Sequence, residues 1–143
     1  MIFQIDESTP YPTFPDPRSG DEDGLFAVGG DLSIDRLLLA YCHGIFPWYS
    51  FRDQPDILWY CPMQRFVIFP EEIHVSHSMR TLINKDQYSY SINEAFDDVI
   101  AQCSKLRIEQ DGAWLGDDMI KAYTELHRQG FASSVEVWDD ATD

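Results

Sequence analysis

Four tryptophans are the residues of this sequence that most invite a chemical role, since an indole outside a hydrophobic core can stack on a nucleobase. Trp48 lies in a segment that proline interrupts, and Trp114 lies between Gly112 and a predicted helix, so both are well placed to line a cleft. Such stacking contributes about 1–3 kcal/mol per base and needs no basic patch. Trp59 and Trp138 have no comparable setting, and a place in the core is the alternative for all four.

One carboxylate lies on a strand that is otherwise apolar. Glu136 stands between Val135 and Val137, and burying a carboxylate is costly unless it has a partner. Glu136 is therefore either a solvent-facing or ion-paired strand residue, or a functional carboxylate that receives an amine or a ribose hydroxyl. Spacing alone supports no Ser/His/Asp or Cys/His arrangement, because the fold brings such partners together.

Two other motifs have a structural explanation beside a functional one. Gly29 and Gly30 precede Asp31 and a helix start. A sharp turn into a capped helix explains the pair better than a phosphate-binding loop, because neither a Walker lysine nor a G-x-G-x-x-G motif follows. His74 and His77 have a spacing that could share a metal ion, but no third ligand is placed beside them. We therefore expect no metal site.

The charge balance argues against binding through a phosphate backbone. The 143 residues include 25 acidic and 10 basic side chains, which give a formal net charge of -15, and no basic arm or stripe is present. Phosphate binding usually needs clustered Lys and Arg, so broad affinity for nucleic acid is not expected from composition. An acidic interaction protein with a basic partner is one alternative that this composition leaves open.

Targeting and redox signals are weak. Cys42, Cys61 and Cys103 are too few and too scattered for a disulfide framework or a Cys-x-x-Cys site. The N-terminus lacks the basic start and apolar run of a signal peptide, and no stretch approaches the length of a membrane span. We expect reduced thiols, no membrane association and a cytoplasmic location.

The first sixty residues predict a small unit that would hold Trp48. Residues 6–24 are rich in Pro, Asp, Ser and Gly, which predicts an extended, turn-rich arm. Ser33 is a suitable N-cap for a helix that stops at Gly44. The apolar segment 45–49 contains a proline, and we expect a structured loop there.

From Arg65 onward the pattern predicts alternating strands and helices. Strands are expected at 66–69, buried on both faces, at 88–92, half-buried, and at 133–138. Three helices are also expected. One lies near 76–84 with an apolar stripe of Met79, Leu82 and Ile83, and the next follows an Asn93 cap with a stripe of Phe96, Val99, Ile100 and Cys103. The third ends before Gly130, and its stripe is Met119, Ile120, Tyr123, Leu126 and His127.

This order predicts an α+β fold with a small N-terminal domain, residues 1–62, and an α/β domain over residues 63–143. The last expected strand lies five residues before the end of the sequence, where a sheet would need its next strand. We therefore expect an incomplete domain with an unpaired edge.

Seven segments, taken in order, resemble the bacterial leucyl/phenylalanyl-tRNA-protein transferase family. The resemblance covers nearly the whole chain from residue 24, and GIFPW after GGDLS is its most specific part. The segments are GLFAVGGDLS (24–33), LLLAYCHGIFPWYS (37–50), ILWYCPMQRFVIFPEEIHVSHSMR (57–80), the AFDDVIAQC helix, AWL (113–115), MIKAYTELHRQGFA (119–132) and SVEVW (134–138).

The resemblance implies an enzyme whose small N-terminal domain precedes the first part of a domain like the Gcn5-related acetyltransferases. Such an enzyme transfers Leu or Phe, and less often Met, from aminoacyl-tRNA to acceptor proteins with an N-terminal Arg or Lys, and so marks them for degradation. The resemblance implies no metal, ATP or coenzyme. A monomer is expected for the complete protein.

The resemblance also implies roles for individual residues. Trp48 matches an indole that stacks on the terminal adenine of the donor tRNA, with Tyr41 beside it. Trp114 and Tyr123 match residues of the same cleft, and Glu136 matches a glutamate that contacts the aminoacyl end. The family continues with a Leu-Val-Gly-Gly segment and with an Asp and a Gln that assist amide formation, none of which lies in these 143 residues. The alternative function is therefore a non-catalytic, truncated relative that binds an aminoacyl-tRNA end or a peptide N-terminus.

Overall fold

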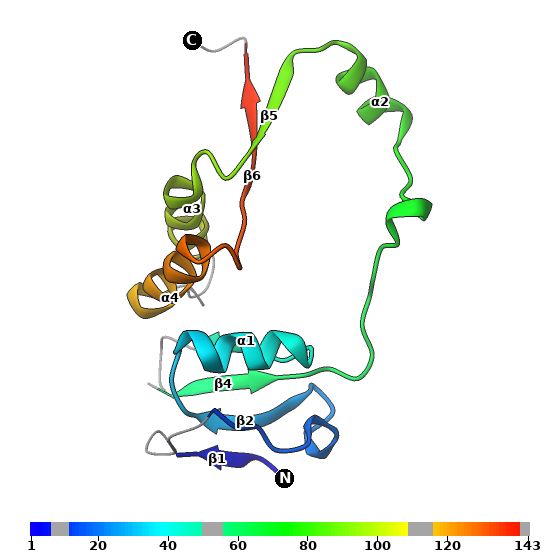
Figure 1. The fold of residues 1–143 in the computed structure, drawn as a ribbon. Coiled ribbons are helices and arrows are strands. Elements are labelled where there is room, and N and C mark those ends of the chain that lie inside the picture. The colour runs from blue at the N-terminus through cyan, green and yellow to red at the C-terminus, as the bar shows by residue number, and fades with distance from the viewer. Residues whose placement is uncertain (7–11, 50–55, 109–115, 141–143) are drawn as a thin grey trace.

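Helices and strands alternate along the chain, and together they confirm the expected α+β fold. The computed structural model describes residues 1–6, 12–49, 56–108 and 116–140. Figure 1 shows the arrangement of the elements. In chain order they are β1 (Phe3–Ile5), the 3-10 turn η1 (Pro17–Ser19), β2 (Leu25–Gly29), α1 (Ile34–Cys42), β3 (Phe46–Tyr49), β4 (Ile57–Tyr60), the 3-10 turn η2 (Pro70–Glu72), α2 (His77–Asn84), β5 (Tyr88–Ile92), α3 (Phe96–Ile108), α4 (Asp117–Arg128) and β6 (Val135–Asp139).

The N-terminal part is a four-stranded sheet in the order β1-β2-β4-β3, with α1 packed on one face (Figure 1). β1 runs parallel to β2, and the other pairs are antiparallel. The core between sheet and helix contains Leu37 and Ala40 from α1 and the fully buried Trp59 from β4. The Trp59 indole nitrogen donates a hydrogen bond to the Gly29 carbonyl at 2.8 Å, which satisfies its one polar group inside the core.

The signals that predict α1 act as expected. The Ser33 hydroxyl accepts a hydrogen bond from the Arg36 amide at 3.4 Å, so Ser33 is the N-cap. Gly44 has a φ of 71°, the left-handed conformation that a glycine tolerates after the last helical turn. These two residues confirm both ends of the predicted helix.

The glycine pair before α1 makes a turn over a buried arginine. Gly29 and Gly30 have φ angles of 95° and 76°, and a Cβ on Gly30 would lie 3.2 Å from Nε of Arg36. The Arg36 side chain is buried, and it donates to Asp31 at 3.3 Å and to the Thr13 carbonyl at 3.3 Å. The sharp-turn interpretation is therefore confirmed, because the space beside Gly30 is filled by a guanidinium of the chain itself.

The segment 45–49, expected to be a loop, is in fact mostly the strand β3. It pairs with β4 in antiparallel register, with Phe46 opposite Tyr60 and Pro47 opposite Trp59. β3 lies at the edge of the sheet, where a proline's missing amide donor costs no ladder hydrogen bond. The prediction was wrong because it weighed the proline without knowing that the strand is an edge strand.

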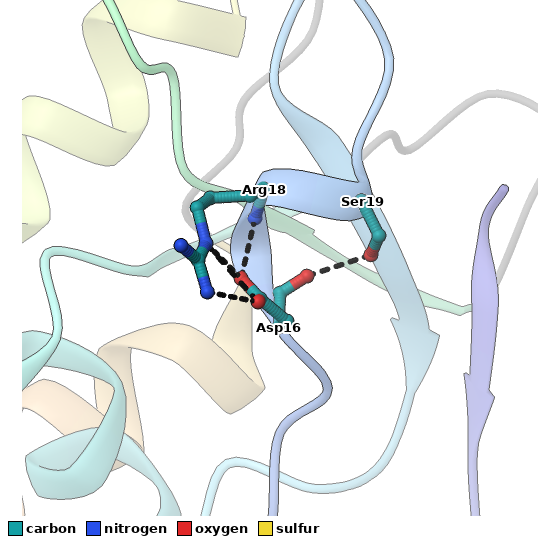
Figure 2. A network of polar contacts seen from close by, with 3 residues as sticks. All are labelled: Asp16, Arg18 and Ser19. Atoms are coloured by element: carbon teal, nitrogen blue, oxygen red, sulfur yellow. Dashed lines mark hydrogen bonds and ion pairs between the residues drawn. The ribbon is translucent and has the colours of Figure 1, made fainter.

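The arm before β2 contains a hydrogen-bonded turn, shown in Figure 2. Asp16 caps the 3-10 turn η1: its carboxylate accepts from the Arg18 backbone amide at 3.0 Å and pairs with the Arg18 guanidinium at 2.6 Å. The Ser19 hydroxyl donates to the Asp16 carbonyl at 2.6 Å. The Arg18 guanidinium lowers the pKa of Asp16 to about 2, so this exposed turn holds its carboxylate in the charged form.

The C-terminal part joins a two-stranded antiparallel sheet, β5-β6, to the helices α3 and α4. Phe96 and Ile100 of α3 pack against the fully buried Met119 of α4. The Phe96 ring also lies parallel to the His127 imidazole, with centroids 3.9 Å apart. This packing confirms the predicted stripes of the two helices, apart from Cys103, which is exposed.

The start of α3 differs from the prediction. Asn93 has a φ of 63° and does not cap the helix; its side-chain oxygen accepts a hydrogen bond from the Ser134 amide at 3.0 Å. The helix begins three residues later, at Phe96. Asn93 therefore ties the start of β6 to the turn after β5, a contact between segments far apart in the sequence.

The segment 66–69 is not the buried strand that its composition predicts. Phe66 is 97% exposed and Ile68 is 66% exposed, and the segment has no regular structure. In Figure 1 it belongs to the long outer stretch that connects β4 to β5 through α2. A strand forms only where another strand accepts its hydrogen bonds, and within the described part of the chain 66–69 pairs with none.

The stretch also contains the predicted helix near 76–84. Ser76 caps α2 by accepting a hydrogen bond from the Met79 amide at 3.2 Å. The expected stripe of Met79, Leu82 and Ile83 is exposed, however. Among the helices that the structure describes, none is long and apolar enough to cross a membrane.

Candidate functional site

Two tyrosines expected in one cleft meet between α1 and α4. The hydroxyl of Tyr41 and the hydroxyl of Tyr123 share a hydrogen bond, and their rings lie edge to face with centroids 6.4 Å apart. Burial raises the pKa of both hydroxyls, so both stay neutral well above neutral pH. Two neutral hydroxyls can donate to, or accept from, a polar ligand that replaces their mutual bond.

Trp48 presents an indole on the surface of β3. It is 41% exposed, and its ring lies edge to face with Tyr60 of β4, with centroids 6.5 Å apart. Indoles stack on nucleobases, and an exposed indole on a strand surface can contact a ligand directly. The setting is therefore suitable for the stacking role that the sequence suggests.

Glu136 is buried on the inner face of β6, at only 6% exposure, while its neighbours Val135 and Val137 are 66% and 69% exposed. Its carboxylate accepts hydrogen bonds from the hydroxyls of Ser134 and Ser91, the latter at 2.5 Å. The partners are thus neutral donors, and of the two alternatives for Glu136 the solvent-facing or ion-paired position does not hold.

Two backbone amides at the start of α3 complete the shell around this carboxylate. The amides of Glu94 and Ala95 donate to its two oxygens at 3.5 and 3.4 Å. The hydroxyl bonds from Ser134 and Ser91, followed by the amide bonds, lower the pKa of Glu136. A carboxylate with these donors is ionised at neutral pH and is held against the N-terminus of a helix, where negative charge is favoured.

Ser91 and Ser134 are the residues that sequence reasoning missed at this position. Ser91 lies directly opposite Glu136 in the β5-β6 register, and its oxygen also accepts the Trp138 indole N–H at 2.8 Å. The alternating serines of residues 88–92 were the available signal, but the pairing register that brings Ser91 to Glu136 is not visible locally.

The structure brings two of the predicted site residues into contact, whereas two others contact different residues. Tyr41 and Tyr123 meet directly, whereas Trp48 contacts Tyr60 on the sheet. The hydrogen-bond partners of Glu136 lie on β5, on β6 and at the start of α3. Trp114 lies outside the described residues.

A metal-based site finds no support in the described ranges. Within residues 1–6, 12–49, 56–108 and 116–140, no group of three or more His, Cys, Asp or Glu side chains could hold a metal ion. The groups that the candidate site residues offer within these ranges are the hydroxyls of Tyr41 and Tyr123, the ionised carboxylate of Glu136 with its donors, and the exposed ring of Trp48.

Comparison with known families places this chain among tRNA-dependent protein transferases. Residues 67–142 match the family model described as leucyl/phenylalanyl-tRNA protein transferase, and residues 30–63 match the model of the N-terminal domain of the same enzyme. The chain belongs to the leucyl/phenylalanyl-tRNA protein transferase family.

Individual relatives agree with the family models. A leucyl/phenylalanyl-tRNA-protein transferase from Pseudomonas fluorescens is 51% identical over 130 residues, which are 90% of this chain and 57% of the relative. One from Psychromonas ingrahamii is 50% identical over 89% of this chain and 53% of its own length. One from Pseudoalteromonas atlantica is 46% identical over 97% of this chain and 58% of its own length. The chain thus spans about half the length of the curated relatives it matches.

Proposed function

We propose that the protein to which this chain belongs transfers Leu or Phe from aminoacyl-tRNA to acceptor proteins with an N-terminal Arg or Lys, and so marks them for degradation in the cytoplasm. The observation that carries the proposal is the family match, which runs through both parts of the chain at about 50% identity to relatives that bear this enzyme's name. The exposed indole of Trp48 supports the proposal. An acidic chain offers few contacts to phosphates, so a donor tRNA would be held by base stacking, which needs an exposed aromatic ring.

The reaction replaces an ester with an amide. The neutral α-amino group of the acceptor attacks the carbonyl carbon of the aminoacyl ester, the bond from that carbon to the ribose oxygen breaks, and the amine's proton ends on the released hydroxyl. Much of the rate in such a reaction comes from holding the two substrates in place, and a base can assist the proton transfer.

Within this proposal the described residues divide the work of holding the donor. Trp48 stacks on the terminal adenine, and the Tyr41 and Tyr123 hydroxyls exchange their mutual hydrogen bond for bonds to the nucleoside. Glu136 acts at the aminoacyl end as the catalytic carboxylate, and Trp114 lines the same cleft.

The same proposal divides the chain into two domains, residues 1–62 and residues 63–143, the second being the first part of a Gcn5-related acetyltransferase-like domain. The two sheets support this division, since one is made from strands within residues 3–60 and the other from strands within residues 88–139. The bond between Tyr41 and Tyr123 joins the two parts.

A transfer assay tests the proposal. We expect this chain to move labelled phenylalanine from charged tRNA to a peptide that begins with Arg, and to leave the same peptide unlabelled when its N-terminus is acetylated. Trp48→Ala is expected to slow transfer at least about fivefold, because a stacked base contributes about 1–3 kcal/mol. Phe131→Ala removes another exposed aromatic, 60% exposed beyond α4, and is expected to leave the rate unchanged. Absence of transfer by the folded chain would contradict catalysis by these 143 residues alone and would favour the second candidate, a relative that binds without transferring.

One observation favours a second candidate, a relative that binds an aminoacyl-tRNA end or a peptide N-terminus without transferring. Both carboxylate oxygens of Glu136 are already occupied by donors from the chain itself. This candidate predicts that charged tRNA binds in a filter assay, with a loss in Trp48→Ala, while the acceptor peptide gains no mass.

A further inference from the structure

One face of the N-terminal sheet carries a row of three aromatic rings that ends in an arginine. The guanidinium carbon of Arg65 lies 5.8 Å from the centre of the Phe46 ring. Phe46 is stacked on Tyr60 at 6.1 Å with an angle of 16° between the rings, and Tyr60 meets Trp48 edge to face at 6.5 Å. The order along the row is Arg65, Phe46, Tyr60, Trp48.

The row lies on the face of the sheet opposite α1. In the β3-β4 register Phe46 is opposite Tyr60, and Trp48 is opposite Leu58, so their side chains share one face. The alternate residues Ile57 and Trp59 are buried with α1. Phe46 and Tyr60 are half-buried, and Trp48 is 41% exposed.

Arg65 is fixed in place at the end of this row. Its Nε donates to the Pro62 carbonyl at 3.1 Å, and Nη2 donates to the Gly44 carbonyl in the turn between α1 and β3. Nη2 also contacts the Cys61 sulfur at 3.7 Å, and no residue that the structure describes accepts from Nη1, so its two N–H groups can donate to a ligand. An ordered, exposed guanidinium of this kind suits a single phosphate group.

We propose that this row is a binding surface for single-stranded RNA, on which the nucleotide next to the donor's terminal one stacks over Phe46 and Tyr60 with its phosphate on Arg65. The inference rests on the proposed function, in which Trp48 holds the terminal adenine. Successive aromatic rings with a cation beside them are the usual surface for unpaired nucleotides, because every base has a face that stacks.

The negative net charge of the chain favours a short single strand as the ligand. With 25 acidic and 10 basic residues, the chain has few cations to pair with the many phosphates of a duplex, whereas one phosphate needs only one guanidinium. Burial, together with the carboxylates of Asp21 and Asp23, raises the pKa of Tyr60, so negative charge lies near its hydroxyl. The phosphate is therefore placed at the Arg65 end of the row.

Calorimetric titration of the 143-residue chain with adenosine and with the trinucleotide CCA tests this inference. We expect CCA, whose middle nucleotide supplies the further stacked base, to bind about fivefold or more tightly than adenosine. Tyr60→Leu and Arg65→Gln are expected to remove most of this gain and to leave adenosine binding unchanged. The matched control is Arg18→Gln, which removes another exposed arginine of the same part of the chain and is expected to change neither affinity.

Salt dependence separates the charge of Arg65 from its structural contacts. In Arg65→Gln the slope of log affinity for CCA against log salt concentration is expected to fall by about 0.7, the value for one phosphate on a single strand. Arg65→Lys is expected to keep the slope. CCA binding no tighter than adenosine, or equal weakening of both ligands by Arg65→Gln, would overturn this inference alone. Absence of binding by either ligand would overturn the proposed donor site as well.

Discussion

The hydroxyl of Tyr41 on α1 is hydrogen-bonded to the hydroxyl of Tyr123 on α4, and this bond links residues 82 positions apart in the sequence. Both side chains also pack at the junction of the two helices, where Tyr123 touches the cores of both parts of the chain. The pair is therefore a structural link between the two parts, and it is also at the proposed donor site.

We predict that Tyr41→Phe and Tyr123→Phe are not additive. Each single variant loses the hydrogen bond and leaves one half-buried hydroxyl without it, at a cost of about 0.5–1.5 kcal/mol in the free energy of unfolding. The double variant should cost less than the sum, because neither hydroxyl remains. Urea unfolding of the parent, the two single variants and the double variant measures these free energies of unfolding. Strictly additive values would show that the two hydroxyls are independent.

The same two tyrosines predict a loss of stability at high pH. Burial raises the pKa of Tyr41 and of Tyr123 in the folded chain, whereas in the unfolded chain both ionise near the usual value of about 10. A raised folded pKa stabilises the fold fully below pH 10, and this contribution is lost as the pH rises further. The double Phe variant should therefore lose less stability than the parent between about pH 9 and pH 11, where tyrosine titrates. Thermal unfolding of both proteins across this range measures the difference.

Glu136→Gln is predicted to destabilise the fold at neutral pH. The neutral amide keeps one acceptor oxygen where the carboxylate offers two, and it lacks the charge that the start of α3 favours. Because the pKa of Glu136 is lowered by folding, its contribution is present above the ordinary glutamate value of about 4.3 and is lost as the pH falls through the lower folded pKa. The difference between parent and variant should therefore shrink in acid.

The control for that experiment is Glu94→Gln, which removes a charge from the same helix start. Glu94 is exposed, and its contribution to the shell is its backbone amide, which the substitution keeps. Equal destabilisation by both variants at pH 7, as followed by urea unfolding, would show that helix charge alone matters and that the hydroxyl shell does not.

Asp31→Asn is predicted to destabilise the N-terminal sheet through Arg36. The Arg36 guanidinium is buried and loses its charged partner, so a cost of about 1–3 kcal/mol is expected. Asp35→Asn removes an exposed carboxylate from the first turn of the same helix and should cost less than about 1 kcal/mol. Similar values for the two variants in urea unfolding would contradict a specific role for the Asp31–Arg36 pair.

Elements with local signals were predictable from the sequence. The cap at Ser33 and the stop at Gly44 define α1, and the alternation of residues 134–138 gives the correct two faces of β6. The sequence pattern did not reveal which face is covered. Polar Glu136 faces inward and the valines face outward, because α3 begins over the polar face and supplies amides to it.

The errors in the fold arise from contacts between distant segments. β3 depends on pairing with β4 at a sheet edge, and the segment 66–69 remains exposed because no described strand lies beside it. At the candidate site, Tyr41, Trp48, Tyr123 and Glu136 were proposed from sequence and resemblance. The hydroxyl shell of Glu136 and the row that leads from Trp48 to Arg65 depend on strand register, which a single sequence does not display.

The central claim is that Trp48 is part of the donor site, and the indole N–H signals in a proton–nitrogen NMR spectrum test it most directly. The ligand is phenylalanyl-adenosine with an amide in place of the labile ester. We predict that the Trp48 signal, assigned with Trp48→Phe, moves on titration, while the Trp59 signal stays because that indole is buried and bound to the Gly29 carbonyl. A Trp48 signal that does not move, whatever the other signals do, would contradict the account.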